Sequence, residues 1–217
     1  VINFFRPSLS LADNNSVRYN FQNNSWEDVE AKAFGTMRGF LTYEEVTDYV
    51  ERIQSIFPEI ISSKTQFGTS ERGTPLYSFA IGSTSFSGSS ALEDRPTIVI
   101  ASLLQPNHAM SLNQNLYLLN YLIYGYFHAD PLAIYILKEF QIILSPLTNP
   151  DGYKKLSDYY SVSNRLDRFF HKNNRDTPGS DCLAINKEQG VNLNHNFAWK
   201  FGSFGSSDDP CSSNYRG

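Results

Sequence analysis

Pro96-Thr-Ile-Val-Ile-Ala-Ser-Leu-Leu104 opens the stretch that decides the expected fold. The stretch continues with His108-Ala-Met-Ser111 and ends with the apolar run from Leu112 to Phe127. The first part is apolar and rich in β-branched residues, and it predicts a strand. The run from Leu112 to Phe127 predicts a buried helix. A strand that passes directly into a helix is typical of an α/β sheet.

A capping box marks the start of another expected helix. In Thr42-Tyr-Glu-Glu45, a side-chain oxygen and a carboxylate can satisfy backbone N–H groups at a helix start. Pro58 suits the end of this helix. The apolar residues that share one helical face behind the box are Val46, Tyr49, Val50, Ile53 and Phe57.

The remaining segments complete an alternation of strands and helices. Further strands are expected over 76–81, 97–104 and 140–146, and further helices over 111–127 and 131–139. This order favours an α/β sheet with helices on its faces. Residues 1–39 are polar and rich in Asn and Ser, so we expect an N-terminal extension before a domain over residues 40–217.

The composition fits an ordered globular protein. The chain has 217 residues, of which 41% are apolar, and this is enough for one domain with a core. Its net charge is −4 and no basic stripe occurs, which argues against nucleic acid as a partner. No apolar run approaches the roughly 18 residues of a membrane span, so we expect none. The first residues lack the basic start and apolar centre of a signal peptide. The alternative that a signal peptide has already been removed stays open, because the chain does not begin with Met.

Five further motifs occur in a fixed order along the chain. They are Phe67 to Tyr77, Asn149-Pro-Asp-Gly-Tyr153, His171-Lys-Asn-Asn-Arg175, Gly190-Val-Asn-Leu-Asn-His-Asn-Phe197 and Pro210-Cys-Ser-Ser-Asn-Tyr-Arg-Gly217. Together with His108-Ala-Met-Ser111, their order and spacing resemble the zinc metallocarboxypeptidases of the carboxypeptidase A/B type. The resemblance implies a mixed β-sheet flanked by helices, in a carboxypeptidase-like (phosphorylase/hydrolase-like) fold whose C-terminal part is missing.

The resemblance places a damaged metal site at His108 and Ser111. His108 aligns with the first zinc ligand of the family, and Ser111 replaces the glutamate ligand. A serine hydroxyl is a poor ligand at neutral pH, and a catalytic zinc needs three protein ligands. We therefore expect no cofactor, although the family cofactor is zinc. Ser-Leu-Asn-Gln114 is also a capping-box pattern, so we expect Ser111 to start a helix rather than to act as a nucleophile.

The oxyanion-stabilising arginine of the family has two candidate positions. The plainest alignment places Asn174 there, and a one-residue loop shift would place Arg175 there. A neutral amide lacks the full charge that stabilises a tetrahedral oxyanion. His171 stands at the first arginine of the same motif, and we expect it to be a solvated loop side chain.

Asn194 and His195 align with the Asn-Arg pair that binds the terminal carboxylate of a peptide substrate. Arginine suits that role because its planar fork bonds both oxygens, whereas an imidazole offers at most one directed donor. Asn192 replaces an aspartate and removes a carboxylate that would help to orient its neighbours. The retained Asn149-Pro-Asp-Gly-Tyr153 motif is expected to serve turn geometry and packing.

The two cysteines and two sequons indicate a secretory location. Cys182 and Cys211 fall at positions where secreted relatives of the family carry a disulfide. Asn14 and Asn23 each begin an Asn-x-Ser glycosylation sequon. We therefore expect a disulfide, glycosylation, and secretion.

Three hypotheses follow for function. In the family, further chain after Tyr-Arg-Gly carries the third zinc ligand, a substrate tyrosine and the general base, so we expect an inactive structural or binding module. Its exposed sheet edge and apolar face would be covered by another protein chain. Alternatively, this is a fragment of an active zinc carboxypeptidase completed by another chain or by further sequence. An incomplete gene model would explain the chain end, but not the substitutions.

Overall fold

The computed structural model describes residues 35–85, 88, 90–164, 170–177, 179, 182 and 188–217. Its elements, in order, are α2 (Tyr43–Ile56), β1 (Thr65–Thr69), β2 (Pro75–Ile81), η2 (Leu92–Asp94), β3 (Thr97–Ala101), α3 (Ala109–Phe127), α4 (Pro131–Glu139), β4 (Gln141–Ser145), α5 (Pro150–Ser163) and η3 (Leu193–His195). Most of the expected extension over 1–39 lies outside the described residues. Met37 is described and is fully buried in the core.

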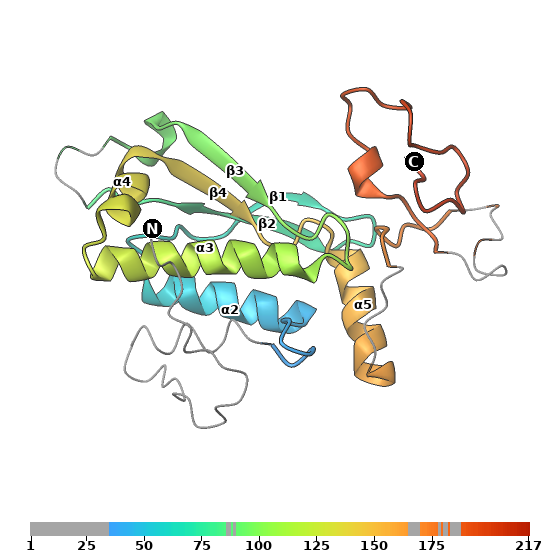
Figure 1. Cartoon of the computed structure of the whole chain (residues 1–217), viewed down its shortest axis with the longest axis horizontal. Helices are drawn as coiled ribbons and strands as arrows, with labels where there is room; N and C mark the ends of the chain where they lie inside the picture. The colour runs from blue at the N-terminus through green and yellow to red at the C-terminus, as the bar shows by residue number, and fades with distance from the viewer. Residues whose placement is uncertain are drawn as a thin grey trace, which may run out of the picture.

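The sheet is mixed, as expected, and its strand order is β1-β2-β4-β3 (Figure 1). β1 and β2 form an antiparallel hairpin, and β2 pairs antiparallel with β4. β3 and β4 are parallel, with Ile98 beside Ile142 and Ile100 beside Leu144. The crossover between them contains α3 and α4, which is the helical connection that parallel strands require.

Helix α2 begins as its sequence predicts. The Thr42 hydroxyl accepts a bond from the Glu45 N–H at 3.3 Å, and the Glu45 carboxylate accepts one from the Thr42 N–H at 2.8 Å. This reciprocal pair is a capping box. The expected apolar face is also confirmed, because its buried residues are Val46, Tyr49, Val50 and Ile53.

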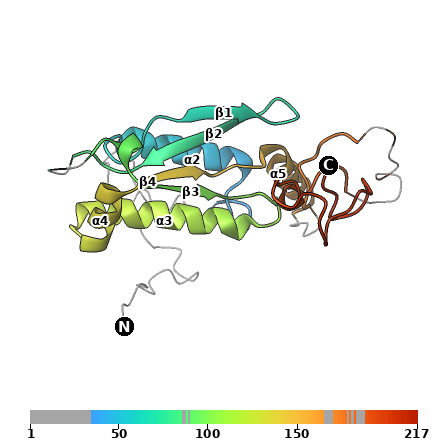
Figure 2. The same cartoon turned by 90° about the horizontal axis from the view of Figure 1, so that it is seen from above.

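The core lies between α2, α3 and one face of the sheet. Phe79 and Ile81 of β2 are buried, whereas Ala80 between them is partly exposed. Strand β4 alternates in the same way around Ile143. Figures 1 and 2 place α2 and α3 on the same side of the strands. Among the described residues, no helix covers the opposite face, on which Val99 is 70% exposed.

β3 is shorter than the sequence predicts, since it ends at Ala101 rather than at residue 104. Leu103 adopts a left-handed backbone with a φ of 58°, and a strand cannot continue through that conformation. The chain turns there, and α3 begins at Ala109. Because β3 and β4 are parallel, the loops that follow them meet at one end of the sheet. None of the helices in the described ranges is both long and apolar enough to traverse a bilayer.

Candidate functional site

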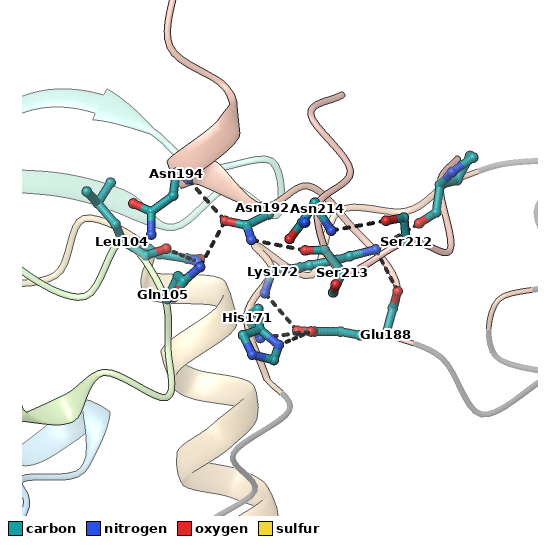
Figure 3. Close-up of polar contacts among 12 residues, drawn as sticks. Leu104, Gln105, His171, Lys172, Glu188, Asn192, Asn194, Ser212, Ser213 and Asn214 are labelled. Carbon is teal, nitrogen blue, oxygen red and sulfur yellow. Dashed lines mark hydrogen bonds and ion pairs between the residues drawn. The ribbon is translucent and has the colours of Figure 1, made fainter. Parts of the chain in front are cut away.

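The motifs singled out in the sequence converge at the carboxyl end of β3 and β4. This is the end at which open α/β sheets bind their ligands. The Asn149 amide donates to the Leu104 carbonyl at 3.0 Å, which joins the loops after the two strands. The Gln105 amide donates to Asn192 Oδ1 at 3.2 Å, which adds the C-terminal segment (Figure 3).

Ser111 is held at the turn between β3 and α3. Its hydroxyl accepts a bond from the Leu103 N–H at 3.0 Å and donates one to the His108 carbonyl at 2.8 Å. Both bonds lock the loop to the first turn of α3. The His108 side chain is exposed and makes no capping bond, although His108 is the N-cap residue.

The expectation that Ser111 would cap the helix is therefore wrong. α3 starts two residues earlier, at Ala109, so Ser111 lies within the first turn. The reason is tertiary, because the left-handed turn at Leu103 leaves an N–H group that the hydroxyl satisfies. The bond from the Leu103 N–H to the Ser111 hydroxyl takes precedence over the capping-box pattern that Ser111 forms with Gln114 in the sequence.

Asn149 and Asp151 tie helix α5 to its surroundings. The Asn149 side chain caps α5 by accepting a bond from the Gly152 N–H at 3.1 Å. The buried Asp151 carboxylate accepts bonds from the hydroxyls of Ser70 at 2.9 Å and Thr74 at 2.8 Å, in the β1–β2 turn. These contacts agree with a role in turn geometry.

Gly152 and Tyr153 complete the same structural motif. A Cβ at Gly152 would lie 2.5 Å from the Lys172 carbonyl oxygen and 2.5 Å from Pro106, so only glycine allows these loops to approach. The fully buried Tyr153 donates from its hydroxyl to the Leu41 carbonyl. Its burial raises the pKa of the Tyr153 phenol. The motif therefore packs and fastens four separate segments.

The candidate oxyanion residues lie against the β1–β2 hairpin. Asn174 has a left-handed backbone, with a φ of 60°, and its carbonyl accepts a bond from Arg72 Nε at 2.9 Å. Arg175 Nε lies 3.5 Å from a Glu71 carboxylate oxygen, and both side chains are about half exposed. The charge of Arg175 therefore faces a carboxylate of the hairpin.

Asn192 is buried and bonds through both the oxygen and the nitrogen of its side-chain amide. Its Oδ1 accepts bonds from the Asn194 N–H at 3.1 Å and from Gln105 at 3.2 Å. Its Nδ2 donates to the Ser213 carbonyl at 3.0 Å (Figure 3). In place of the carboxylate, the amide holds three neighbours, Gln105, Asn194 and Ser213. A carboxylate could not donate to Ser213.

Asn194 and His195 lie in the short helix η3, directly after Asn192. The Asn194 side chain is exposed and that of His195 is half-buried. Asn196, which follows them, donates from its side chain to the Arg216 carbonyl. The segment is thus fixed by its neighbours, and His195 presents an imidazole there.

His171 is not the solvated side chain that the sequence suggests. It is half-buried, and its Nδ1 lies 3.6 Å from the Glu188 carboxylate. That carboxylate also accepts bonds from the backbone N–H groups of His171 and Lys172, each at 2.8 Å (Figure 3). Burial raises the pKa of the Glu188 carboxyl, and the two N–H donors oppose this effect.

Lys172 is a buried residue that the sequence reasoning missed. Its side chain is 1% exposed, and Nζ donates to the carbonyls of Glu188 at 2.9 Å and Pro210 at 2.8 Å. The ammonium group therefore joins three segments of the site. The position of Lys172 within the His171-Lys-Asn-Asn-Arg175 motif is the sequence feature that could have indicated its role. No sequence feature indicates the role of Glu188.

Cys182 and Cys211 form a disulfide, as the resemblance implies. The bond joins residues that are 29 positions apart and closes the loop that contains Asn192 and η3. A disulfide is typical of proteins of oxidising compartments. The two sequon asparagines, Asn14 and Asn23, lie outside the described residues.

His108 and Ser111 do not together supply the ligands of a zinc site. His108 is one exposed imidazole, and the Ser111 hydroxyl is neutral and bonded to the backbone on both sides. Catalytic zinc is held by three His, Glu, Asp or Cys ligands. Within the described ranges, no three such side chains gather closely enough to hold a metal ion.

Comparison with known proteins identifies the family. A family profile described as "Zinc carboxypeptidase" matches residues 46–217. The chain belongs to the zinc carboxypeptidase family. It is 28% identical to carboxypeptidase A1 of Sus scrofa over 178 residues, which are 81% of this chain and 37% of the relative. It is 29% identical to carboxypeptidase A4 of Mus musculus over 193 residues, which are 88% of this chain and 40% of the relative.

Solved structures confirm the carboxypeptidase fold. The crystal structure of thrombin activatable fibrinolysis inhibitor matches with a TM-score of 0.69 at 22% identity, covering 91% of this chain and 44% of that one. Carboxypeptidase A from Helicoverpa armigera matches with a TM-score of 0.61 at 25% identity, covering 86% of this chain and 40% of that one. The chain therefore spans less than half the length of these relatives.

Proposed function

We propose that this chain is a carboxypeptidase-like scaffold without peptidase activity, which serves as a structural or binding module. The observation that carries the proposal is the environment of Ser111. In the motif alignment Ser111 replaces the family's glutamate ligand, and its hydroxyl is bonded to Leu103 and His108. The residue at this position now stabilises the turn into α3 instead of offering a charged ligand.

The other substituted positions support the same conclusion. Peptide hydrolysis in this family requires positive charge at the developing oxyanion and a fork that positions the terminal carboxylate. Asn174 is neutral, and Arg175 is paired with Glu71. His195 provides an imidazole in place of the fork. The retained residues, such as Asn149 and Asp151, make bonds within the scaffold.

The binding part of the proposal rests on the sheet. Among the described residues, β3 is the last strand of the sheet and no helix covers one of the sheet's faces. Unpaired edges and apolar faces of this kind are typical protein-binding surfaces. We propose that another protein chain covers this edge. The disulfide supports an oxidising, secretory location, where glycosylation at Asn14 and Asn23 would also occur.

A second hypothesis is that the chain is a fragment of an active zinc carboxypeptidase. The observation in its favour is that the chain spans only 37% of carboxypeptidase A1. A partner chain or further sequence could supply a histidine and a general base. It could not restore the carboxylate replaced by Ser111, which argues for the scaffold instead.

Peptidase assays distinguish the two hypotheses when the chain is tested together with any further sequence or partner chain that completes it. The substrate is a dipeptide with a blocked amino group and a free terminal carboxylate, tested with added zinc and with a chelator. We expect no release of the terminal residue from either the natural chain or Ser111→Glu, because catalytic groups act as a unit and one repair restores almost nothing. Zinc-dependent release by the unmodified chain would overturn the proposal and favour the enzyme fragment.

A further inference from the structure

A cluster of charged side chains lies beside the candidate site, and the proposed function does not use it. The cluster contains His171, Lys172 and Glu188 (Figure 3). The Glu188 carboxylate accepts bonds from the backbone N–H groups of His171 and Lys172, each at 2.8 Å. The Glu188 side chain is only 12% exposed, so water contributes little to its solvation. The carboxylate therefore depends on the neighbouring chain for hydrogen bonds.

Further bonds fasten the chain around Glu188 to the chain around Lys172. The Asn173 N–H donates to the Val191 carbonyl at 2.9 Å, and the Val191 N–H donates to Asn173 Oδ1 at 2.9 Å. Lys172 Nζ donates to the carbonyls of Glu188 at 2.9 Å and Pro210 at 2.8 Å. The segment with the candidate substrate residues continues from Val191, so its position depends on these bonds.

His171 makes the attachment of Glu188 sensitive to pH. Its Nδ1 lies 3.6 Å from Glu188 Oε2, and its side chain is 28% exposed. The charge of a histidine side chain changes between about pH 5 and 8. A protonated imidazole attracts a carboxylate at this distance, whereas a neutral imidazole lacks that attraction. The attachment is therefore stronger when His171 carries its second proton.

Other titratable groups face the same cluster from different elements. Lys155 of α5 acts on the Glu188 carboxylate, and Lys172 Nζ lies 5.7 Å from the centre of the Tyr215 ring. Burial raises the pKa of the Glu188 carboxyl, whereas the two backbone donors and the charges of His171 and Lys155 oppose this rise. Loss of the His171 charge therefore makes the buried carboxylate less favourable.

We propose that His171 and Glu188 form a pH-sensitive latch that holds residues 188–195 near pH 6 and loosens them near pH 8. Histidines act as switches in this way when protonation changes the strength of a contact between two segments. The Cys182–Cys211 disulfide closes the loop that contains residues 188–195, so the loosened segment stays attached. The latch goes beyond the proposed function, because it applies to a scaffold and to an enzyme fragment alike.

Amide hydrogen exchange of the whole chain, followed by NMR, tests the latch. The reporters are the N–H groups of His171, Lys172 and Asn173, which bond to residues 188–191. After correction for the intrinsic pH dependence of exchange, their protection should be roughly three- to fivefold lower at pH 8 than at pH 6, the size that an ion pair gives. The N–H groups of β4 are the internal reference, and their protection should change by less than about twofold.

Two variants separate the ion pair from a merely structural contact. His171→Asn has no titratable group at this position, and Glu188→Gln retains the size of the side chain without its charge. In both variants the protection of the Asn173 N–H should be equal at pH 6 and pH 8. His128→Asn is the matched control, because His128 is an exposed histidine at the end of α3, on the opposite side of the molecule from the C-terminal segment in Figure 1. This control should keep the pH dependence of the natural chain.

Equal protection of the Asn173 N–H at both pH values in the natural chain would overturn the latch. The full pH dependence in His171→Asn would overturn it as well, as would an equal loss of protection in β4, which would show unfolding of the whole domain. None of these results depends on zinc or on peptidase activity, so a failure of the latch leaves the proposed function intact.

Discussion

Restoring the family's aspartate at position 192 should destabilise this chain. Asn192 is 2% exposed, and its Nδ2 donates to the Ser213 carbonyl at 3.0 Å. In Asn192→Asp an acceptor replaces that donor, and a carboxylate loses its solvation. The lost hydrogen bond contributes about 1 kcal/mol, and an unpaired buried group costs a further 1–3 kcal/mol or so. Because the contact is only partly buried, we expect the free energy of unfolding to fall by about 2–3 kcal/mol at pH 7.

Urea unfolding at two pH values measures this change. The introduced carboxyl is buried, so its pKa in the folded chain should be raised above the unfolded value. The penalty is therefore present at neutral pH and disappears as the pH falls below the unfolded pKa of about 4. A protonated carboxyl can also donate to Ser213. We expect the difference between Asn192→Asp and the natural chain to shrink strongly at pH 4, with an unchanged m-value.

Asn194→Asp is the matched control, because Asn194 belongs to the same segment and its side chain is exposed. Its unfolding free energy should stay within about 0.5 kcal/mol of the natural chain. Equal stability of Asn192→Asp and the natural chain at pH 7 would refute the reasoning. It would mean that the donation to Ser213 contributes nothing.

Two further predictions concern the same segment. Thiol labelling of the unreduced, denatured chain should find no reactive thiol, and two labelled thiols would contradict the disulfide. Cys211→Ser should lower the unfolding free energy by about 3.5 kcal/mol, on the chain-entropy model for a bond between residues 29 apart. Burial raises the pKa of the Glu188 carboxyl above its ordinary 4.5. The unfolding free energy of the natural chain relative to Glu188→Gln should therefore be greatest below pH 4.5 and should decrease as the pH rises through the raised pKa. Urea titrations in which this difference increases with pH would contradict the prediction.

Sequence reasoning predicted those elements whose determinants are local. The capping box at Thr42 and Glu45 involves residues of one helix turn, and it formed as expected. The helix before Pro58 and the strand around Ile142 and Leu144 have strong apolar patterns, and both are present. The mixed sheet and the Cys182–Cys211 bond came from the family resemblance, which carries tertiary information that local patterns lack.

The failures share a tertiary cause. The capping pattern at Ser111 was locally valid, but the N–H of Leu103, eight residues earlier, engages its hydroxyl. His171 looked like a loop residue, but Glu188 approaches it from a segment beyond the reach of local patterns. Lys172 is buried because carbonyls from distant segments accept its ammonium group. Contacts of this kind form between segments that are far apart in the chain. Local sequence patterns therefore do not predict them.

The distribution of retained and changed residues has a physical explanation. Asn149, Asp151 and Tyr153 each bond a different neighbouring segment, so replacing any of them would weaken the scaffold. In the motif alignment, Ser111 and His195 replace a metal ligand and a substrate anchor, and neither the ligand nor the anchor is needed for packing. The contacts that hold the fold are therefore separate from the groups that the proposed loss of activity concerns.

Zinc content tests the central claim most directly. The purified chain is incubated with zinc, dialysed, and analysed by inductively coupled plasma mass spectrometry alongside an active carboxypeptidase A. Because Ser111 offers a neutral hydroxyl bonded to Leu103 and His108, the account predicts far less than one equivalent of zinc per chain. One equivalent that survives dialysis and is lost on His108→Ala would contradict it.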